Sequence, residues 1–282
     1  MPGRNRRIKQ GLLLTLAIGF VLMSSQPMSG YRLLRLAGRA LPALAQADWL
    51  ALEGEHFTIY FREADGDIAR EISENLELVL SQLQDDWPIK IENVPVTIHP
   101  DQTSLGKAIG AQAEATLGAY WLGRLELLSP RAWLSAVPSE DMMAVYREQG
   151  PLTHELVHLL LDYRVHGNCP LWFSEGLAQR YERDLQGYTW GIMGASWSVP
   201  LYSLEQLTSQ FTQLEAYPAY RQALGLVDYI WNVAGDRGMA LLLERLSEGD
   251  RFAGALEAVT GRTLQELEQG WRAQLQLETA ED

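Results

Sequence analysis

Two histidines stand four positions apart in the run His154-Glu155-Leu156-Val157-His158. On an α-helix, residues four apart lie on one face about one turn along, so both imidazoles can reach the same metal ion. Glu155 occupies the next position around the helix, where its carboxylate can meet a water on that metal without being a ligand. The run therefore predicts a helix that carries a metal site on one face.

The same residues could instead form a buried histidine pair in an apolar helix. Leucine and valine side chains surround His158, which favours burial. However, a charged Glu155 in so apolar a helix costs several kcal/mol unless it is paired or lies near a cation. A bound metal supplies that cation, so we favour the metal site.

A second motif, Trp-Phe-Ser-Glu-Gly, occupies residues 172–176 and supplies the missing ligand. A catalytic zinc needs three protein ligands and one open position for water. We predict that one Zn²⁺ is held by His154, His158 and Glu175, with Glu175 on a second helix that Pro170 begins. Two imidazoles and one carboxylate with an open position suit zinc.

Residues 151–182, which hold both motifs, resemble the active-site segment of the peptidase MA-like proteins. These are gluzincins, zinc proteases related in core fold to thermolysin, and weaker similarity extends over most of residues 53–277. The resemblance implies an α+β fold: a thermolysin-like zincin core with a small mixed sheet and an active-site helix, followed by an all-helical C-terminal part. Sixteen residues separate His158 from Glu175, slightly fewer than in thermolysin, so the connecting loop at 164–169 is short.

The resemblance also implies catalytic and substrate-binding roles. Glu155 would be the general base, and the edge strand that starts at Gly118, Ala119 and Tyr120 would pair with the substrate backbone. A tyrosine that opens a later helix would stabilise the oxyanion, and Tyr220 best matches that place. Other candidates for this donor are His166, Tyr217 and Tyr229.

Metal-ligating histidines need an acceptor for their second ring N–H. Asp162 lies one turn beyond His158 on the same helix face and is a second-shell candidate. A solvated acid at the helix C-terminus is the equally open alternative for Asp162. Ser174 or Gln179 could orient Glu175.

The resemblance implies hydrolysis of peptide or protein substrates. The sequence around Gly118 lacks the Gly-Ala-Met-Glu-Asn amine anchor of zinc aminopeptidases, which favours an endopeptidase. Two alternatives stay open at this point. The protein could be a non-catalytic exported domain that zinc stabilises, or a zinc hydrolase of a non-protein amide such as a cell-wall link.

The N-terminus predicts export. Four basic residues within positions 4–9 precede an apolar run at 11–23. Thirteen residues are short for a membrane span, which needs about 20. Either the chain is cleaved near Ala43-Leu44-Ala45, or the segment stays as a membrane anchor. Residues 31–44 form a basic amphipathic stretch that either lies on a membrane surface or serves as a linker.

The charge balance excludes a nucleic-acid-binding role. Residues 1–45 hold seven of the 23 Lys and Arg residues and none of the 36 Asp and Glu residues, so the remainder carries 16 bases against 36 acids. So acidic a domain lacks the cations that neutralise phosphates. Cys169 is the one cysteine, so we expect a structural thiol and no internal disulfide.

We expect three parts: an export signal or anchor with linker at 1–45, the zincin core at 46–183 and a helical subdomain at 184–282. Within the core, the pattern predicts strands at 56–62 and 94–99, an extended stretch at 117–128, and helices at 65–85 and 151–163. A loop at 185–199 would overhang the cleft. Further helices are expected at 204–214, 220–234, 238–247, 252–259 and 264–277.

Overall fold

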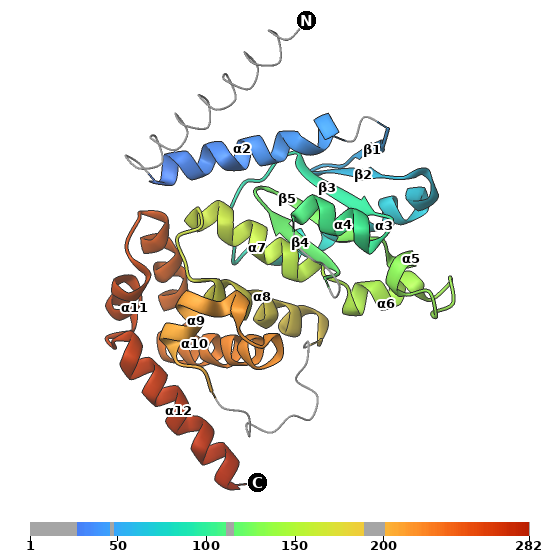
Figure 1. Cartoon of the computed structure of the whole chain (residues 1–282). Coiled ribbons are helices and arrows are strands. Elements are labelled where there is room, and N and C mark those ends of the chain that lie inside the picture. Colours follow the sequence, from blue (N-terminus) through green and yellow to red (C-terminus); the bar gives the residue numbers. More distant parts are fainter. Residues whose placement is uncertain (1–26, 46–47, 111–115, 189–200, 282) are drawn as a thin grey trace, which may run out of the picture.

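A computed structural model describes residues 27–45, 48–110, 116–188 and 201–281 (Figure 1). The apolar run at 11–23 and most of the predicted loop at 185–199 therefore lie outside the described residues. Among the described helices, none combines the length and the apolar character that a membrane crossing requires.

Five strands form one mixed sheet in the order β1-β2-β3-β5-β4. The central pairs β2–β3 and β3–β5 are parallel, whereas the outer pairs β1–β2 and β4–β5 are antiparallel. This leaves β4 as an edge strand, as the sequence predicted for residues 118–121. The strands are β1 (Leu50–Glu53), β2 (Phe57–Phe61), β3 (Val94–His99), β4 (Gly118–Trp121) and β5 (Arg124–Leu128).

The two faces of the sheet differ in chemistry. Val96, Ile98 and Leu127 belong to the apolar core, which the helices α3 (Gly66–Leu83) and α7 (Leu152–Val165) also line. On alternate positions, His99 Nε2 lies 2.7 Å from a Glu126 carboxylate oxygen, and Arg124 pairs with the same carboxylate. Because both faces are covered, β3 is buried along its whole length.

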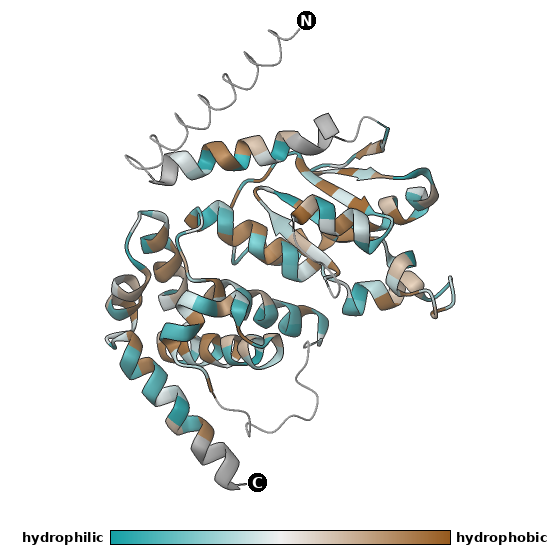
Figure 2. Cartoon of the chain, viewed as in Figure 1, coloured by the Kyte–Doolittle hydropathy of each residue, from teal (hydrophilic) through white to brown (hydrophobic). Residues whose placement is uncertain are grey.

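Most helices pack below and beside the sheet, whereas α2 lies at the top of the view (Figure 1). Figure 2 shows apolar positions along β3 and on α7 and α10, where these elements pack together. The helices are α2 (Pro27–Ala45), α3 (Gly66–Leu83), α4 (Gln102–Ile109), α5 (Pro130–Trp133), α6 (Met142–Gln149), α7 (Leu152–Val165), α8 (Leu171–Gln186), α9 (Leu204–Gln210), α10 (Ala216–Ser247), α11 (Phe252–Thr260) and α12 (Leu264–Glu281).

The structure confirms the α+β class and corrects several local expectations. The stretch at 117–128 is a hairpin rather than one strand, because Leu122 and Gly123 turn the chain with φ angles of 47° and 87°. The expected helices at 220–234 and 238–247 are confirmed as the two arms of α10, which the non-helical Gly235 separates. Strand β1 and helix α4 were not predicted. Helix α8 continues through residue 183, where the core was expected to end, and the division into subdomains stays a prediction.

Helix α2 is docked on the half of the molecule that contains the sheet. Arg39 donates to the backbone oxygens of Glu92 and Asn93, and Arg124 donates to the backbone oxygen of Gly38. A Cβ on Gly38 would lie 2.3 Å from the Leu122 oxygen, so the helix backbone touches the β4–β5 turn directly. The basic residues of α2 thus bind the protein's own acidic domain.

Helices α8 and α10 also approach each other closely, at Gly176, the last residue of the Trp-Phe-Ser-Glu-Gly motif. A Cβ on Gly176 would lie 2.3 Å from the Ala223 backbone oxygen. Trp172 and Phe173 are fully buried beside Phe252. The motif therefore fixes the depth and rotation of α8 against the helical part of the molecule.

We predict opposite effects for two Gly→Ala changes inside helices. Gly176→Ala should lower the free energy of unfolding by about 1–3 kcal/mol, because backbone must move to admit the methyl group. Gly254→Ala in α11, where nothing lies within 4 Å of the new Cβ, should instead raise it by roughly 0.5–1 kcal/mol. Urea unfolding of both variants measures this, and equal effects would contradict the close approach of α8 and α10.

Candidate metal centre

The structure brings His154, His158 and Glu175 together as the sequence predicted. Their ligand atoms all lie within 4.8 Å of one another. One Glu175 oxygen is 3.2 Å from His154 Nε2 and 3.5 Å from His158 Nε2. Two turns of α7 and the first turns of α8 supply the three side chains, so the crossing of these helices creates the site.

The second ring nitrogen of each histidine also has a partner. His154 Nδ1 lies 3.4 Å from a Glu182 oxygen, and His158 Nδ1 lies 2.8 Å from Ser174 Oγ. A carboxylate can only accept, so Glu182 places the proton of a neutral His154 on Nδ1. The Nε2 lone pair is then free to face Glu175, which is the arrangement that a metal ligand needs.

Charge interactions within the group follow from burial and proximity. Burial alone would raise the pKa of Glu175, but His158 and His154 overcome this and hold it well below its usual range. Burial opposes protonation of His154, but Glu175 and Glu182 raise its pKa well above the ordinary histidine value. Two carboxylates converge on the His154 imidazole. A proton on this ring therefore balances their negative charge in the metal-free protein, as a bound metal cation would.

The donor set therefore fits a divalent cation. Two Nε2 atoms and one carboxylate oxygen face the same point, and the group is largely shielded from solvent. Such a set with three protein ligands is typical of a zinc centre with an open position.

Glu155 lies beside this group without belonging to it. It is buried, and burial raises its pKa despite the two nearby imidazoles. One of its oxygens accepts a hydrogen bond from Tyr120 N at 2.7 Å, and Gly118 packs against its side chain. Glu155 therefore lies between the metal-ligand group and the edge strand β4, whose residues 118–121 line the same cleft.

Tyr220 also lines this cleft, at the start of α10. Burial, followed by the charges of Glu175 and Glu155, raises the pKa of its hydroxyl, which stays protonated at neutral pH. Two other donor candidates are engaged elsewhere: His166 contacts the arginines of α2, and the Tyr229 hydroxyl accepts from Arg262. Tyr217, the third, does not line this cleft.

Asp162 does not face the ring of His158, whose Nδ1 is taken by Ser174. Its carboxylate instead accepts from the Tyr120 hydroxyl at 2.5 Å and lies 3.2 Å from Arg35. The expectation that Asp162 accepts a hydrogen bond from His158 is therefore wrong. Asp162 instead joins α7 to β4 and α2. Gln179 donates to the backbone oxygens of Glu175 and Tyr220 and so ties α8 to α10.

The cleft that these residues line has a volume of about 630 Å³. Cys169 lies on its wall, and burial followed by the charge of Asp162 raises the pKa of this thiol to about 12. At neutral pH it is a thiol, and it does not belong to the group of His154, His158 and Glu175 whose ligand atoms converge. This agrees with the structural role expected for it.

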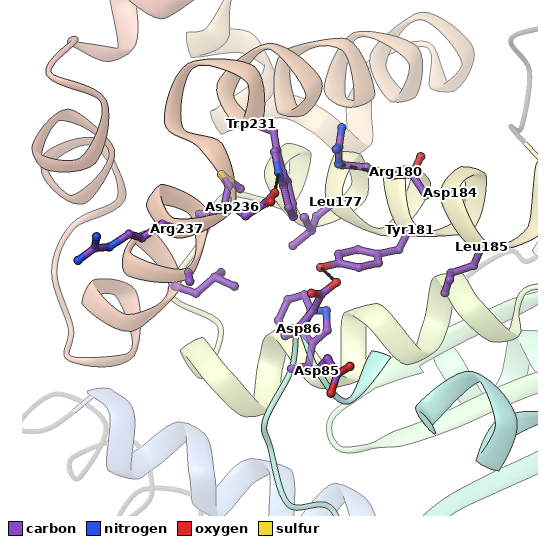
Figure 3. Close-up of a pocket in the computed structure, with 14 residues that line it drawn as sticks. Asp85, Asp86, Leu177, Arg180, Tyr181, Asp184, Leu185, Trp231, Asp236 and Arg237 are labelled. Carbon is purple, nitrogen blue, oxygen red and sulfur yellow. Dashed lines mark hydrogen bonds and ion pairs between the residues drawn. The ribbon is translucent and has the colours of Figure 1, made fainter. Parts of the chain in front are cut away.

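A second cavity of about 550 Å³ lies on another face of α8, between the break in α10 and residues 85–87 (Figure 3). Tyr181 and Trp231 form its walls, and Asp86 accepts from the Tyr181 hydroxyl at 3.1 Å. Arg180 stacks on the Trp231 ring. The metal-ligand residues do not line this cavity.

Comparison with known proteins agrees with this geometry. The model of the Peptidase MA superfamily matches residues 141–277, which span α6 to most of α12. This match to the peptidase MA superfamily covers just under half of the chain and includes both motifs. A match to this superfamily suggests a metallopeptidase. A search of curated proteins finds no match for the chain.

Glu182 contacts the site in a way that sequence reasoning missed. It lies seven positions after Glu175, two turns along the same face of α8, a spacing that predicts too great a distance for a ligand. The structure agrees that it does not join the three ligands, yet it reaches the other nitrogen of His154. The two-turn spacing was the available signal, but only the crossing angle of α7 and α8 reveals the contact.

We predict graded losses of zinc affinity for two matched substitutions. Glu175→Gln should weaken binding by orders of magnitude, because a neutral amide is a poor ligand for zinc. Glu182→Gln should weaken it by about 10–100-fold, as expected for an outer partner of a ligating histidine. Competition against a coloured zinc chelator measures both. A loss in Glu182→Gln that exceeds the loss in Glu175→Gln would overturn the assignment.

Proposed function

We propose that the protein is an exported zinc metallopeptidase that hydrolyses peptide bonds. The observation that carries this proposal is the position of Glu155. It is a buried carboxylate that stands outside the three-ligand group, 2.7 Å from the backbone N–H of an edge strand in the same cleft. A purely structural zinc site is closed and needs no base beside it.

When bound, zinc would supply a Lewis acid and would acidify a water molecule. Glu155 then takes the proton of the attacking water and passes it to the leaving amine. Its raised pKa brings it closer to the neutral range in which a carboxyl group can both accept and donate a proton.

The substrate backbone would add to the free edge of β4. The sheet places this edge along the cleft, and Tyr120 N already points away from β5 towards Glu155. An extended peptide that pairs with β4 presents its carbonyls to the metal-ligand group. Tyr220, protonated and on the opposite wall, would donate to the oxyanion that forms on the attacked carbonyl.

We further propose attachment to a membrane by the N-terminal segment. Leu33 and Leu36 on the outer face of α2 are 54% and 58% exposed, while the arginines of the same helix bind the protein. Figure 2 shows this alternation of apolar and hydrophilic positions along α2. An outward apolar face that directly follows the apolar run at 11–23 suits a helix lying on a bilayer surface.

We predict that Glu155→Gln abolishes peptide cleavage and keeps zinc. The amide preserves the shape of the side chain but cannot take the water's proton, so kcat should fall by about 10²–10⁴-fold. Cleavage of a peptide library by mass spectrometry and zinc content by atomic absorption measure the two quantities. Glu148→Gln, an exposed glutamate on α6, is the matched control.

A wild-type protein that binds zinc and cuts no peptide would refute the proposal in favour of a non-catalytic domain. Tyr220→Phe tests the oxyanion donor separately. It should lower kcat by about 10²–10³-fold with little change in zinc content. An unchanged kcat in this variant would remove Tyr220 from the mechanism.

Membrane attachment has its own test. Membranes from cells that make the full chain are washed with alkaline carbonate and sedimented. We expect the protein in the pellet, because an apolar segment buried among acyl chains resists this treatment. Complete release into the supernatant would contradict attachment.

A further inference from the structure

Helix α2 forms part of the catalytic cleft. Tyr31 lines the same cavity as the metal ligands and β4. Its ring packs over Gly167 in the loop between α7 and α8, where a Cβ would come within 3.0 Å of the ring. Tyr31 lies more than a hundred positions before the metal-binding motif, yet the fold places it in the same cleft.

A buried network joins α2 to the edge strand. Asp162, whose side chain is 6% exposed, accepts from the Tyr120 hydroxyl and lies 3.2 Å from Arg35, which is 13% exposed. The Tyr120 hydroxyl in turn accepts from Gly123 N at the β4–β5 turn, at 2.9 Å. Arg35 therefore neutralises the one carboxylate that holds the side chain of Tyr120 in place.

Arg35 and Arg32 also meet the C-terminal end of α7. Arg35 Nη1 donates to the Asp162 backbone oxygen at 3.3 Å. The guanidinium carbon of Arg35 lies 4.1 Å from the centre of the Tyr163 ring. Arg32 lies 2.8 Å from His166 Nε2. Cations are favoured at the negative end of a helix dipole, so these contacts fix α2 on the helix that carries both histidine ligands.

We propose that α2 completes the substrate cleft: Tyr31 contacts the substrate, and Arg35 is a positioning residue that holds strand β4 through Asp162 and Tyr120. Removal of Arg35 leaves Asp162 as an uncompensated buried carboxylate, which must take up a proton or attract water. The Tyr120 hydroxyl then loses its charged partner, and β4 loses its attachment to α7 at that point. The role of Tyr31 rests on the proposed peptidase function, whereas the role of Arg35 does not.

Hydrogen–deuterium exchange on the zinc-loaded full chain in detergent micelles tests the positioning role without any substrate. We expect Arg35→Gln to raise the exchange rate of residues 118–123 by roughly tenfold and to leave β2 and β3 unchanged. Arg70→Gln, which removes an exposed arginine of α3, and Leu36→Ala, on the outer face of α2, are the matched controls. Unchanged exchange of residues 118–123 in Arg35→Gln would overturn the positioning role.

Arg35→Lys keeps the cation and is the second variant if Arg35→Gln does not fold. We expect its exchange at residues 118–123 to lie between wild type and a fully opened strand. If Arg35→Gln is unfolded as a whole and Arg35→Lys exchanges at the wild-type rate, Arg35 stabilises the protein in general. That result would overturn its specific role in positioning β4.

Cleavage of a diverse peptide library by the full chain tests Tyr31. We expect Tyr31→Ala to change the preferred side chain at subsites on one side of the scissile bond, with Arg70→Gln cutting as the wild type does. An identical cleavage profile for Tyr31→Ala and wild type would remove Tyr31 from the cleft. Absence of cleavage by the wild type would refute the proposed function instead, and the exchange experiment would still decide the role of Arg35.

Discussion

Burial of several ionisable side chains in one place is the constraint on which the candidate metal centre depends. Glu155, Glu175 and Glu182 are buried and His154 is half-buried beside them, and an isolated charge in such surroundings is very unfavourable. Each is tolerable because it faces another, and a cation at the shared point relieves the excess negative charge. The apolar surroundings of α7 make this arrangement strong, since few water molecules compete for the same groups.

The close packing of α8 supports this group from behind. Gly176 lets α8 lie directly on the backbone of α10, and the buried rings of Trp172 and Phe173 prevent rotation of the helix. Glu175 and Ser174, which lie between these packing residues in sequence, then have one direction available to them. The Trp-Phe-Ser-Glu-Gly motif therefore contains the metal-ligand residue Glu175 and Ser174, the hydrogen-bond partner of His158. It also contains the packing residues that orient both side chains.

Much of the site could be predicted from the sequence because its signals are local. The three ligands, Glu155 and the edge strand at 118–121 each follow from spacing on a helix or strand, or from a resemblance that rests on short motifs. The break at Gly235 is local in the same way. In contrast, Asp162 was assigned to His158 because one helix was considered alone, whereas its partners Tyr120 and Arg35 come from two other elements. The docking of α2 could not be predicted because a basic amphipathic pattern suits a membrane surface and an acidic protein surface equally well.

The docking of α2 gives the predicted processing site an unusual significance. Ala43, Leu44 and Ala45 form the last residues of the helix, so a cut there would fall between α2 and the first strand. Such a cut leaves the three ligands and Glu155 in the remaining chain. Helix α2, which covers Asp162 through Arg35, would then be held only by noncovalent contacts. Retention or release of this helix would thus decide whether the cleft beside the metal-ligand group keeps the wall that Tyr31 forms. Under the proposed function, cleavage after α2 would change the range of substrates that fit the cleft as well as the location of the protein.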